Sequence, residues 1–329
     1  MTDKKNGVDT STEVNEVEQE VPAGIPASGI HQDSWSISSA MSGRKILITG
    51  ATGFLAKVLV SMILRYHPDV DQLYVVIRPR RTVTAAERFR EELIENGTFD
   101  PLREIYGAGL DDFVQEKVTV IPGDITSRFL GMKEDEAKAL SSTLDVFINS
   151  AGLTNFNPNL EHALEINTLS EYNIQEFIEL GDYHCALQHI STCFVAGNTR
   201  DPSPERLPTP DFYPSVDDLG VDFDVDREID DCQRMIAHAK ELAKDQEQTS
   251  AFHRDALEKL KKRNLNPERD EYYQAAYREV RDAWIKNHLS YRGRDRAAHW
   301  GFPNIYTYTK SMGERLLAKN KGKINFAIV

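Results

Sequence analysis

The sequence predicts an α/β fold built on a doubly wound parallel sheet. Strand-like and helix-like segments alternate from Arg44 onwards, and a glycine turn joins the first strand to the first helix. A largely helical stretch then interrupts the alternation before the last helix and strand. Strands joined through helices form right-handed crossovers, so the strands of such a sheet run parallel.

The predicted strands are short runs rich in β-branched and apolar residues, such as "RKILIT" and "QLYVVIR". The predicted helices carry apolar residues at helical spacing, as in "GFLAKVLVSMILRYHP", which Pro68 ends. The predicted strands are 44–49, 72–78, 117–124, 144–152, 186–197 and 323–329. The predicted helices between them are 53–68, 84–97, 133–142, 160–180 and 304–320.

Residues 200–300 break this alternation. They open with the Pro- and Asp-rich segment "DPSPERLPTPDFYPSVDDLG" and continue as charged helical sequence, which predicts a helical insertion between the fifth strand and the last helix. Residues 1–42 are polar, acidic and dotted with Pro and Gly, so we expect a disordered tail there. The remaining residues, 43–329, stop at the sixth strand. We therefore expect a domain from the front part of a longer protein, with its C-terminal substrate region absent.

Composition narrows the classes of function. Among 329 residues, 40% are hydrophobic, which is enough for a core, and the net charge of −13 argues against a nucleic-acid-binding surface. No apolar run reaches about 18 residues, so no membrane span is expected. Cys185, Cys193 and Cys232 have no paired spacing, which favours a reducing, cytoplasmic location. Cys232 and His238 lack a second ligand pair, so we expect no metal site.

The turn after the first strand has the pattern of a dinucleotide-binding site. In Gly50-x-x-Gly53-x-x-Ala56, the first glycine permits a tight backbone path and the second lets the backbone approach a pyrophosphate. Ala56 is small enough for close packing of helix on strand, and the helix N-terminus offers free N–H groups to phosphate. The pattern predicts a Rossmann-type fold, and a purely structural turn is the alternative.

The end of the second strand indicates which dinucleotide would bind. An NAD site needs an acidic residue there to hold the ribose 2′-hydroxyl. In "VVIRPRR", Arg78 stands at that point, followed by Arg80 and Arg81. Guanidinium groups suit a 2′-phosphate, so the sequence favours NADP, with a solvated basic loop as the alternative.

The last helix carries a candidate catalytic pair. Tyr306 and Lys310 are four residues apart, so both point to one face of the helix. A neighbouring ammonium favours the phenolate and lowers the pKa of a tyrosine, which allows it to exchange a proton at neutral pH. Tyr308 lies on another face and ranks second.

Further candidates lie at the ends of strands or in the helix that follows. Ser191 and Thr192 end the fifth strand, at the sheet edge where open α/β folds bind ligands. A hydroxyl there could stabilise charge on a substrate carbonyl oxygen. Asn167 could complete a proton path through water, and Asp124 either hydrogen-bonds adenine or starts a turn. The segment "INSAG", from Asn149 to Gly152, would pass under the cofactor.

Several motifs together resemble the reductase domain of alcohol-forming fatty acyl-CoA reductases, which belong to the extended short-chain dehydrogenase/reductase superfamily. They are "ITGATGFLAKVLV", "YVVIRPR", "INSAGLTNF", "ALEINTLSEYNI", "HISTCFVAGN" and "YTYTKSMGERLL". The bacterial members are the nearest in pattern. The resemblance covers about Gly43 to Val329. Ala56 and Gly152 depart from the usual residues, but neither change should abolish binding.

The resemblance implies an NADPH-dependent enzyme that reduces a long-chain acyl thioester, on CoA or a carrier protein, to an alcohol through an aldehyde. Tyr306 and Lys310 would be the catalytic pair, with the hydroxyl supplied by Thr192 or by the adjacent Ser191. The residues implied in cofactor binding are Gly50, Thr52, Gly53, Phe54, Leu55, Arg78, Asp124, Ile125, Ser150, Ala151, Asn167, Tyr306 and Lys310. Peripheral membrane contact is compatible with such a substrate.

Three alternatives stay open at this level. A thioester reductase could stop at the aldehyde, and an epimerase or dehydratase of the same superfamily would act on a sugar nucleotide. A non-enzymatic NADP-sensing protein is the third alternative, although such proteins often lose the Tyr/Lys pair. The basic stretch "HRDALEKLKKRN" in the insertion could attract a phosphate-bearing carrier such as CoA, although an exposed helix face with mixed charge is the commoner explanation.

Overall fold

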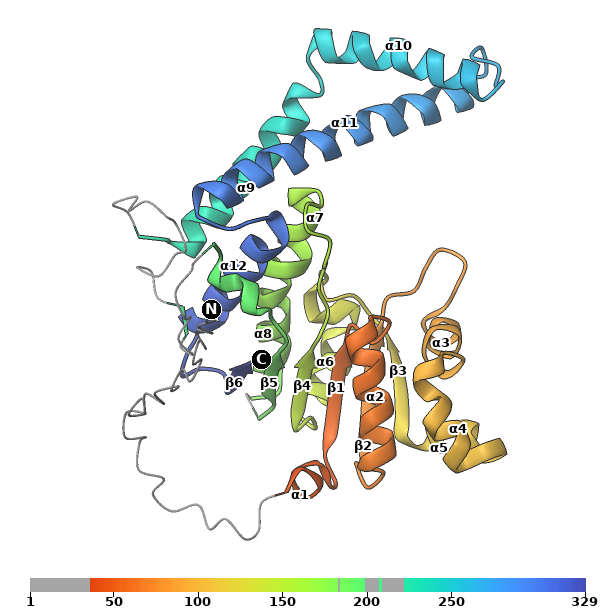
Figure 1. The fold of residues 1–329 in the computed structure, drawn as a ribbon, viewed down its shortest axis with the longest axis vertical. Helices are drawn as coiled ribbons and strands as arrows, with labels where there is room; N and C mark the ends of the chain where they lie inside the picture. The colour runs from red at the N-terminus through yellow and green to blue at the C-terminus, as the bar shows by residue number, and fades with distance from the viewer. Residues whose placement is uncertain (1–35, 183, 199–206, 209–221) are drawn as a thin grey trace, which may run out of the picture. The chain divides into compact units, whose positions relative to one another are not determined.

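A computed structural model describes residues 36–182, 184–198, 207–208 and 222–329 (Figure 1). Its centre is a six-stranded parallel sheet with the order β3-β2-β1-β4-β5-β6. The strands are β1 Lys45–Thr49, β2 Gln72–Ile77, β3 Val118–Pro122, β4 Val146–Asn149, β5 Ala186–His189 and β6 Phe326–Ile328. This confirms the predicted Rossmann-type doubly wound fold.

The strand order changes direction at β1. The chain moves outward from β1 through β2 to β3, then returns to place β4 on the other side of β1, with Thr49 opposite Asn149 in the register. The two crossovers from this pair of strands therefore leave in opposite directions, which opens a crevice at the carboxyl ends of β1 and β4.

Helices cover both faces of the sheet. On one face, Ile46 and Ile48 of β1 join a core with Val60 of α2 Phe54–Tyr66. On the other face, Leu47 and Phe147 join a core with Phe177 of α8 Ser170–Leu180. Successive strand residues point to opposite faces, so one apolar strand supplies both cores. The other helices of the sheet layers are α3 Ala85–Phe89, α4 Asp100–Tyr106, α5 Leu110–Lys117, α6 Glu134–Ser141, α7 Leu160–Leu164 and α12 Ile305–Lys319.

The predicted insertion is helical, as expected. It contains α9 Val225–Leu242, α10 Gln246–Lys262 and α11 Asp270–His299, and Figure 1 shows α10 and α11 side by side as a hairpin. Ile229 and Cys232 of α9 pack into the same core as Tyr308 of α12. The insertion is therefore anchored on the helix that carries the candidate Tyr/Lys pair.

Some predicted boundaries were wrong. Residues 37–41 form the short helix α1 Ile37–Met41, so the irregular tail does not extend to residue 42, and residues 1–35 lie outside the described part. The fifth strand ends at His189 instead of reaching 197, because a 3₁₀ turn, Cys193–Ala196, follows it. Helices α4 and α5 were not predicted. Most of the Pro- and Asp-rich segment at 201–220 lies outside the described residues.

A π-helical turn, Glu165–Leu169, separates α7 from α8 and packs against α12. The contact is close: a Cβ at Gly313 would lie 2.5 Å from the backbone oxygen of Asn167. The Thr168 hydroxyl also donates to the Thr309 backbone oxygen at 2.8 Å. A glycine in the middle of a helix is normally unfavourable, so its place here is explained by this contact.

Replacing Gly313 by Ala should destabilise the fold, although Ala is the better helix former. We expect a loss of about 1–3 kcal/mol in the free energy of unfolding, because the added methyl group must displace backbone. Urea denaturation would measure it. Gly109→Ala is the matched control, since a Cβ there has no neighbour within 4 Å. Equal stability of the two variants would contradict the close contact.

Candidate active site

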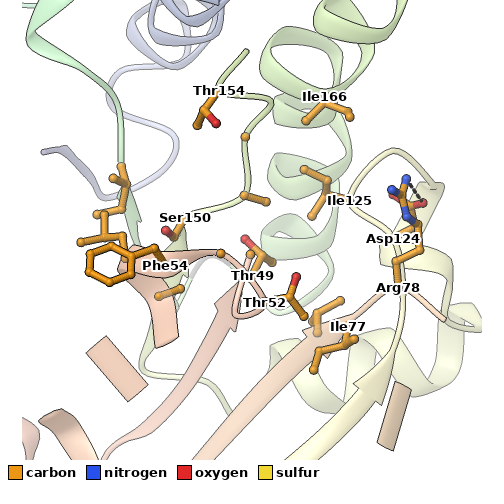
Figure 2. A pocket seen from close by; sticks show the side chains of 18 of the residues that line it. Thr49, Thr52, Phe54, Ile77, Arg78, Asp124, Ile125, Ser150, Thr154 and Ile166 are labelled. Carbon is orange, nitrogen blue, oxygen red and sulfur yellow. Dashed lines mark hydrogen bonds and ion pairs between the residues drawn. The ribbon is translucent and has the colours of Figure 1, made fainter. Parts of the chain in front are cut away.

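A cleft of about 610 Å³ lies at the carboxyl ends of β1 and β4. Figure 2 shows its two ends: Arg78 and Asp124 lie at one, and Phe54, Ser150 and Thr154 lie at the other. Its volume falls within the range of about 300–1,000 Å³ that is typical of small-molecule and cofactor sites. The cleft therefore occupies the crevice that the strand order creates.

The glycine turn forms the floor of this cleft. Gly50 has a φ of +73°, and a Cβ there would lie 2.6 Å from the peptide that joins Ser150 to Ala151. The Gly53 N–H donates to the Gly50 backbone oxygen at 2.8 Å, which closes the turn. Only glycine satisfies both the left-handed conformation and the close approach of β1 to β4 at this position.

The N-terminus of α2 faces the cleft. Gly53 is its N-cap and has no side chain to accept a hydrogen bond, while Phe54, Leu55 and Ala56 line the cleft. The N–H groups of a first helical turn have no partner within the helix, and the helix dipole adds positive potential there. These groups fit the pyrophosphate of a dinucleotide.

The other end of the cleft is basic. Arg78 directly follows β2 and pairs with Asp124 at 3.4 Å, as the dashed line in Figure 2 marks. The same Asp124 carboxylate accepts from the backbone N–H of Thr126 at 3.0 Å, so Asp124 does start a turn and also lines the cleft. Arg88 of α3 also lines the cleft and donates to the Arg78 backbone oxygen. Two guanidinium groups therefore line this end of the cleft.

Tyr306 and Lys310 both line the cleft from the first turns of α12. The Tyr306 N–H donates to the Phe156 backbone oxygen at 3.2 Å, which attaches the start of α12 to the loop after β4. Tyr308 points the other way: it is fully buried, donates to Glu228 and lies 3.2 Å from Cys232 Sγ. Burial is the main cause that raises the pKa of Tyr308 well above its ordinary value.

Lys310 is held at a defined point of the cleft wall. Its Nζ donates to the Ile190 backbone oxygen at 2.8 Å and lies 3.1 Å from His189 Nε2. Burial lowers the pKa of Lys310, and the carboxylates of Glu171 and Glu314 oppose that effect. A lysine in this setting gives up its proton more readily than a solvated one.

The structure separates the two candidate hydroxyl groups. Ser191 lines the cleft, and its hydroxyl donates to Glu314 of α12. Burial raises the pKa of Glu314, and the hydrogen bond from Ser191 opposes this. Thr192 is not among the residues that line the cleft; its hydroxyl caps the following 3₁₀ turn by accepting from the Phe194 N–H at 3.3 Å.

Asn167 also lies outside the cleft lining. Its side chain accepts from the Leu153 N–H at 2.8 Å and donates to the Leu153 backbone oxygen at 3.2 Å. It also donates to the Thr309 hydroxyl at 3.1 Å. These bonds tie the loop after β4 to α12, so the side chain serves to hold the site together.

The sequence model of the family described as "Male sterility protein" matches residues 48–329. The chain belongs to this family. It is 31% identical over 302 residues to "Alcohol-forming fatty acyl-CoA reductase" of Simmondsia chinensis, a match that covers 91% of this chain and 53% of that protein. It is 30% identical over 291 residues to "Fatty acyl-CoA reductase 8" of Arabidopsis thaliana, with 88% and 51% covered. The chain thus spans about half the length of these relatives.

The predicted resemblance to fatty acyl-CoA reductases of the extended short-chain dehydrogenase/reductase superfamily is confirmed by these matches. Because both relatives are plant proteins, they do not bear on the predicted bacterial subtype. A solved structure, "The crystal structure of the terminal R domain from the myxalamid PKS-NRPS biosynthetic pathway", is 26% identical over 51% of this chain and 40% of that one, with a TM-score of 0.41. That score is too low to support an argument.

Most of the predicted site residues meet in this one cleft of the male sterility protein family domain. Those that line it are Gly50, Thr52, Gly53, Phe54, Leu55, Arg78, Asp124, Ile125, Ser150, Ala151, Ser191, Tyr306 and Lys310. The lining residues that the sequence analysis did not single out are Thr49, Val76, Ile77, Arg88, Gly123, Thr154, Ile166 and Ile190. Arg88 could have been suspected, because it is a basic residue on the helix that follows the arginine-rich loop. The cleft and the family together indicate a nicotinamide dinucleotide cofactor.

Other expectations concern features away from the cleft. Within the described ranges, no helix is both long enough and apolar enough to cross a membrane. Among those same residues, no group of three potential metal ligands comes together. Cys232 is buried against Tyr308, and burial raises the pKa of its thiol to about 12. Its contacts are those of a core residue.

Substitutions at the two glycines of the turn should differ in their effect on stability, while both weaken cofactor binding. Gly50→Ala should lower the free energy of unfolding by about 1–3 kcal/mol, because its Cβ meets the Ser150–Ala151 peptide. The displaced turn should also bind the dinucleotide at least about tenfold more weakly. Gly53→Ala should weaken binding with a smaller loss of stability, since its φ is −77° and its Cβ would lie 3.1 Å from the Gly50 oxygen. Thermal unfolding and fluorescence titration with NADPH would measure both. Unchanged binding in Gly50→Ala would contradict this account of the turn.

Proposed function

We propose that the protein is an NADPH-dependent reductase that converts a long-chain acyl thioester, on CoA or on a carrier protein, to a primary alcohol through an aldehyde. The observation that carries this proposal is the convergence of Tyr306, Lys310 and the Gly50 turn on one cleft. The names of the relatives support the thioester as the substrate class. The proposal concerns the whole protein, since the chain spans about half the length of those relatives.

The residues of the cleft have distinct roles in the proposed reaction. Bound NADPH supplies the hydride that the thioester carbonyl carbon accepts. The Tyr306 hydroxyl donates a proton to the carbonyl oxygen, and the Lys310 ammonium stabilises the phenolate that remains. The Ser191 hydroxyl, which lines the cleft, turns from Glu314 to donate a hydrogen bond to the same oxygen as negative charge develops. The hemithioacetal then releases the thiol, and a second reduction converts the aldehyde to the alcohol.

Tyr306→Phe tests the proton donor. We expect turnover to fall at least about 100-fold, since general acid catalysis contributes about 10²–10⁴-fold. NADPH affinity should change little, because the ring and its packing remain. The measurement is NADPH oxidation with palmitoyl-CoA, and Tyr291→Phe, an exposed position on α11, is the control. Wild-type turnover in Tyr306→Phe would overturn the assignment.

Arg78 supports NADPH as the preferred cofactor. It lines the cleft at the end of β2, and its side chain is 58% exposed. Among the described residues its charged partner is Asp124, at a long 3.4 Å, so the guanidinium can turn toward a phosphate. Arg88 adds positive charge nearby, although Glu92 pairs with it at 2.9 Å.

Arg78→Ala should raise KM for NADPH about tenfold or more and leave KM for NADH nearly unchanged, since only NADPH carries the 2′-phosphate. Initial rates with each cofactor would measure this. Arg81→Ala is the matched control, because Arg81 is exposed and outside the cleft lining. Equal losses with both cofactors would mean that Arg78 does not contact the 2′-phosphate.

Product analysis decides between the proposed reaction and its alternatives. Gas chromatography of the lipid products should show the alcohol as the final product, with about two NADPH consumed per acyl chain. Aldehyde as the only product would indicate a thioester reductase, and turnover of a sugar nucleotide would indicate an epimerase or dehydratase.

A further inference from the structure

A chain of buried polar side chains extends from Lys310 into the core, behind the cleft. It runs through His189 of β5 and Glu171 of α8, and no more than 3% of any of these three residues is exposed. Lys310 Nζ lies 3.1 Å from His189 Nε2, and His189 Nδ1 lies 3.1 Å from Glu171 Oε1. The proposed mechanism uses Lys310 but gives neither His189 nor Glu171 a role.

Neighbouring groups fix the direction of this chain. Asn149 Oδ1 accepts from the Thr49 hydroxyl at 2.7 Å and lies 3.3 Å from the Ala151 N–H, so its amide nitrogen must face Glu171. That nitrogen donates to Glu171 Oε1 at 3.0 Å. The same oxygen accepts from Asn149 and lies 3.1 Å from His189 Nδ1. The Asn149 amide nitrogen also lies 3.3 Å from His189 Nδ1, so the histidine tautomer decides whether these two nitrogens form a hydrogen bond.

The hydrogen-bond directions decide the state of His189. A lysine ammonium can only donate, so His189 Nε2 must accept from it and the ring proton must sit on Nδ1. Nδ1, which then carries the proton, lies 3.1 Å from the carboxylate oxygen Oε1 of Glu171. An imidazolium at His189 would place two donors opposite each other at 3.1 Å. The arrangement is therefore consistent only with a neutral His189 while Lys310 carries its proton.

The surroundings of Lys310 balance its buried charge. The titratable groups that act on it are Glu314 from α12, His189 from β5 and Glu171 from α8, and Tyr306 lines the same cleft. Without nearby carboxylates, an ammonium as buried as this one would tend to lose its proton. Glu171 lies behind His189 as seen from Lys310. Glu314 lies on the same helix as Lys310, and its carboxylate accepts a hydrogen bond from the Ser191 hydroxyl.

The chain does not lead to solvent. Glu171 is 1% exposed, and its second oxygen, Oε2, has no hydrogen-bond partner among the described residues. A proton that entered at Lys310 would therefore stop inside the core. The arrangement therefore favours a role in positioning Lys310 over a role in proton transfer.

We propose that His189 and Glu171 are positioning residues that hold Lys310 as a fixed ammonium at the cleft wall. Glu171 holds the histidine ring in one tautomer, and the ring then presents Nε2 to the lysine. A carboxylate that fixes the tautomer and orientation of a histidine is a known device in enzyme sites. The kinetic test of this inference rests on the proposed reductase function, whereas its spectroscopic test does not.

The kinetic test uses Glu171→Gln, which keeps the shape of the side chain and removes its charge. Loss of the carboxylate removes an interaction that raises the pKa of Lys310. The lysine should then lose its proton at lower pH. We expect the alkaline limb of the kcat/KM profile for palmitoyl-CoA reduction to move down by about one pH unit. Below that limb, kcat/KM should stay within about threefold of the wild-type value.

Glu228→Gln is the control for neutralising a buried carboxylate. Glu228 is 2% exposed and pairs with Arg296, away from the cleft lining. This variant should lose stability without moving the alkaline limb. An unmoved limb in folded Glu171→Gln, or an equal shift in Glu228→Gln, would overturn the proposal.

The spectroscopic test needs no turnover. In protein labelled with ¹⁵N-histidine, the His189 signal, assigned with His189→Asn, should be that of the Nδ1-protonated tautomer, because Nε2 accepts from Lys310. Lys310→Met removes the donor that faces Nε2, so the signal of the Nε2-protonated tautomer should then appear. A ring protonated on Nε2, or an imidazolium at pH 7 in the wild type, would overturn the proposal. If the wild-type protein reduced no acyl thioester, the reductase function would fail while this test still stood.

Discussion

The close approach of the β1 turn to the end of β4 is the constraint on which the site depends. It is possible only because Gly50 has a φ of +73° and no side chain, which brings the turn against the Ser150–Ala151 peptide. The turn then directs the N-terminus of α2 into the crevice where the strand order changes direction. A pyrophosphate site results from backbone geometry alone, and the side chains around it are free to determine the chemistry.

A second close approach places those side chains. Gly313 lets α12 rest on the π-helical turn at Asn167, and Asn167 in turn binds the loop after β4. The start of α12 is attached to the same loop through Phe156. These contacts set Tyr306 and Lys310 against the cleft, while α9 covers the opposite side of the helix at Tyr308. The insertion thus stabilises the helix that carries the pair.

The polar residues behind Lys310 place three ionisable groups, Lys310, His189 and Glu171, in the buried interior. A buried lysine, histidine and glutamate are costly to desolvate, and such groups persist only when each finds partners. Thr49, Asn149, His189 and Glu171 supply these partners across β1, β4, β5 and α8. The central strands of the sheet therefore contribute to the proposed reaction from inside the protein as well as at their carboxyl edge.

Local patterns determined much of this protein. The strand–glycine turn–helix pattern, the Arg78 position and the spacing of Tyr306 and Lys310 depend on backbone conformation and helical periodicity, which short stretches of sequence encode. Sequence could not show that Ser191, and not Thr192, lines the cleft, because that depends on a strand that ends at His189 and on the turn after it. Nor could it give the role of Asn167 or join His189 to Glu171. These contacts link residues on different strands and helices, so only the packing of the sheet and its helices decides them.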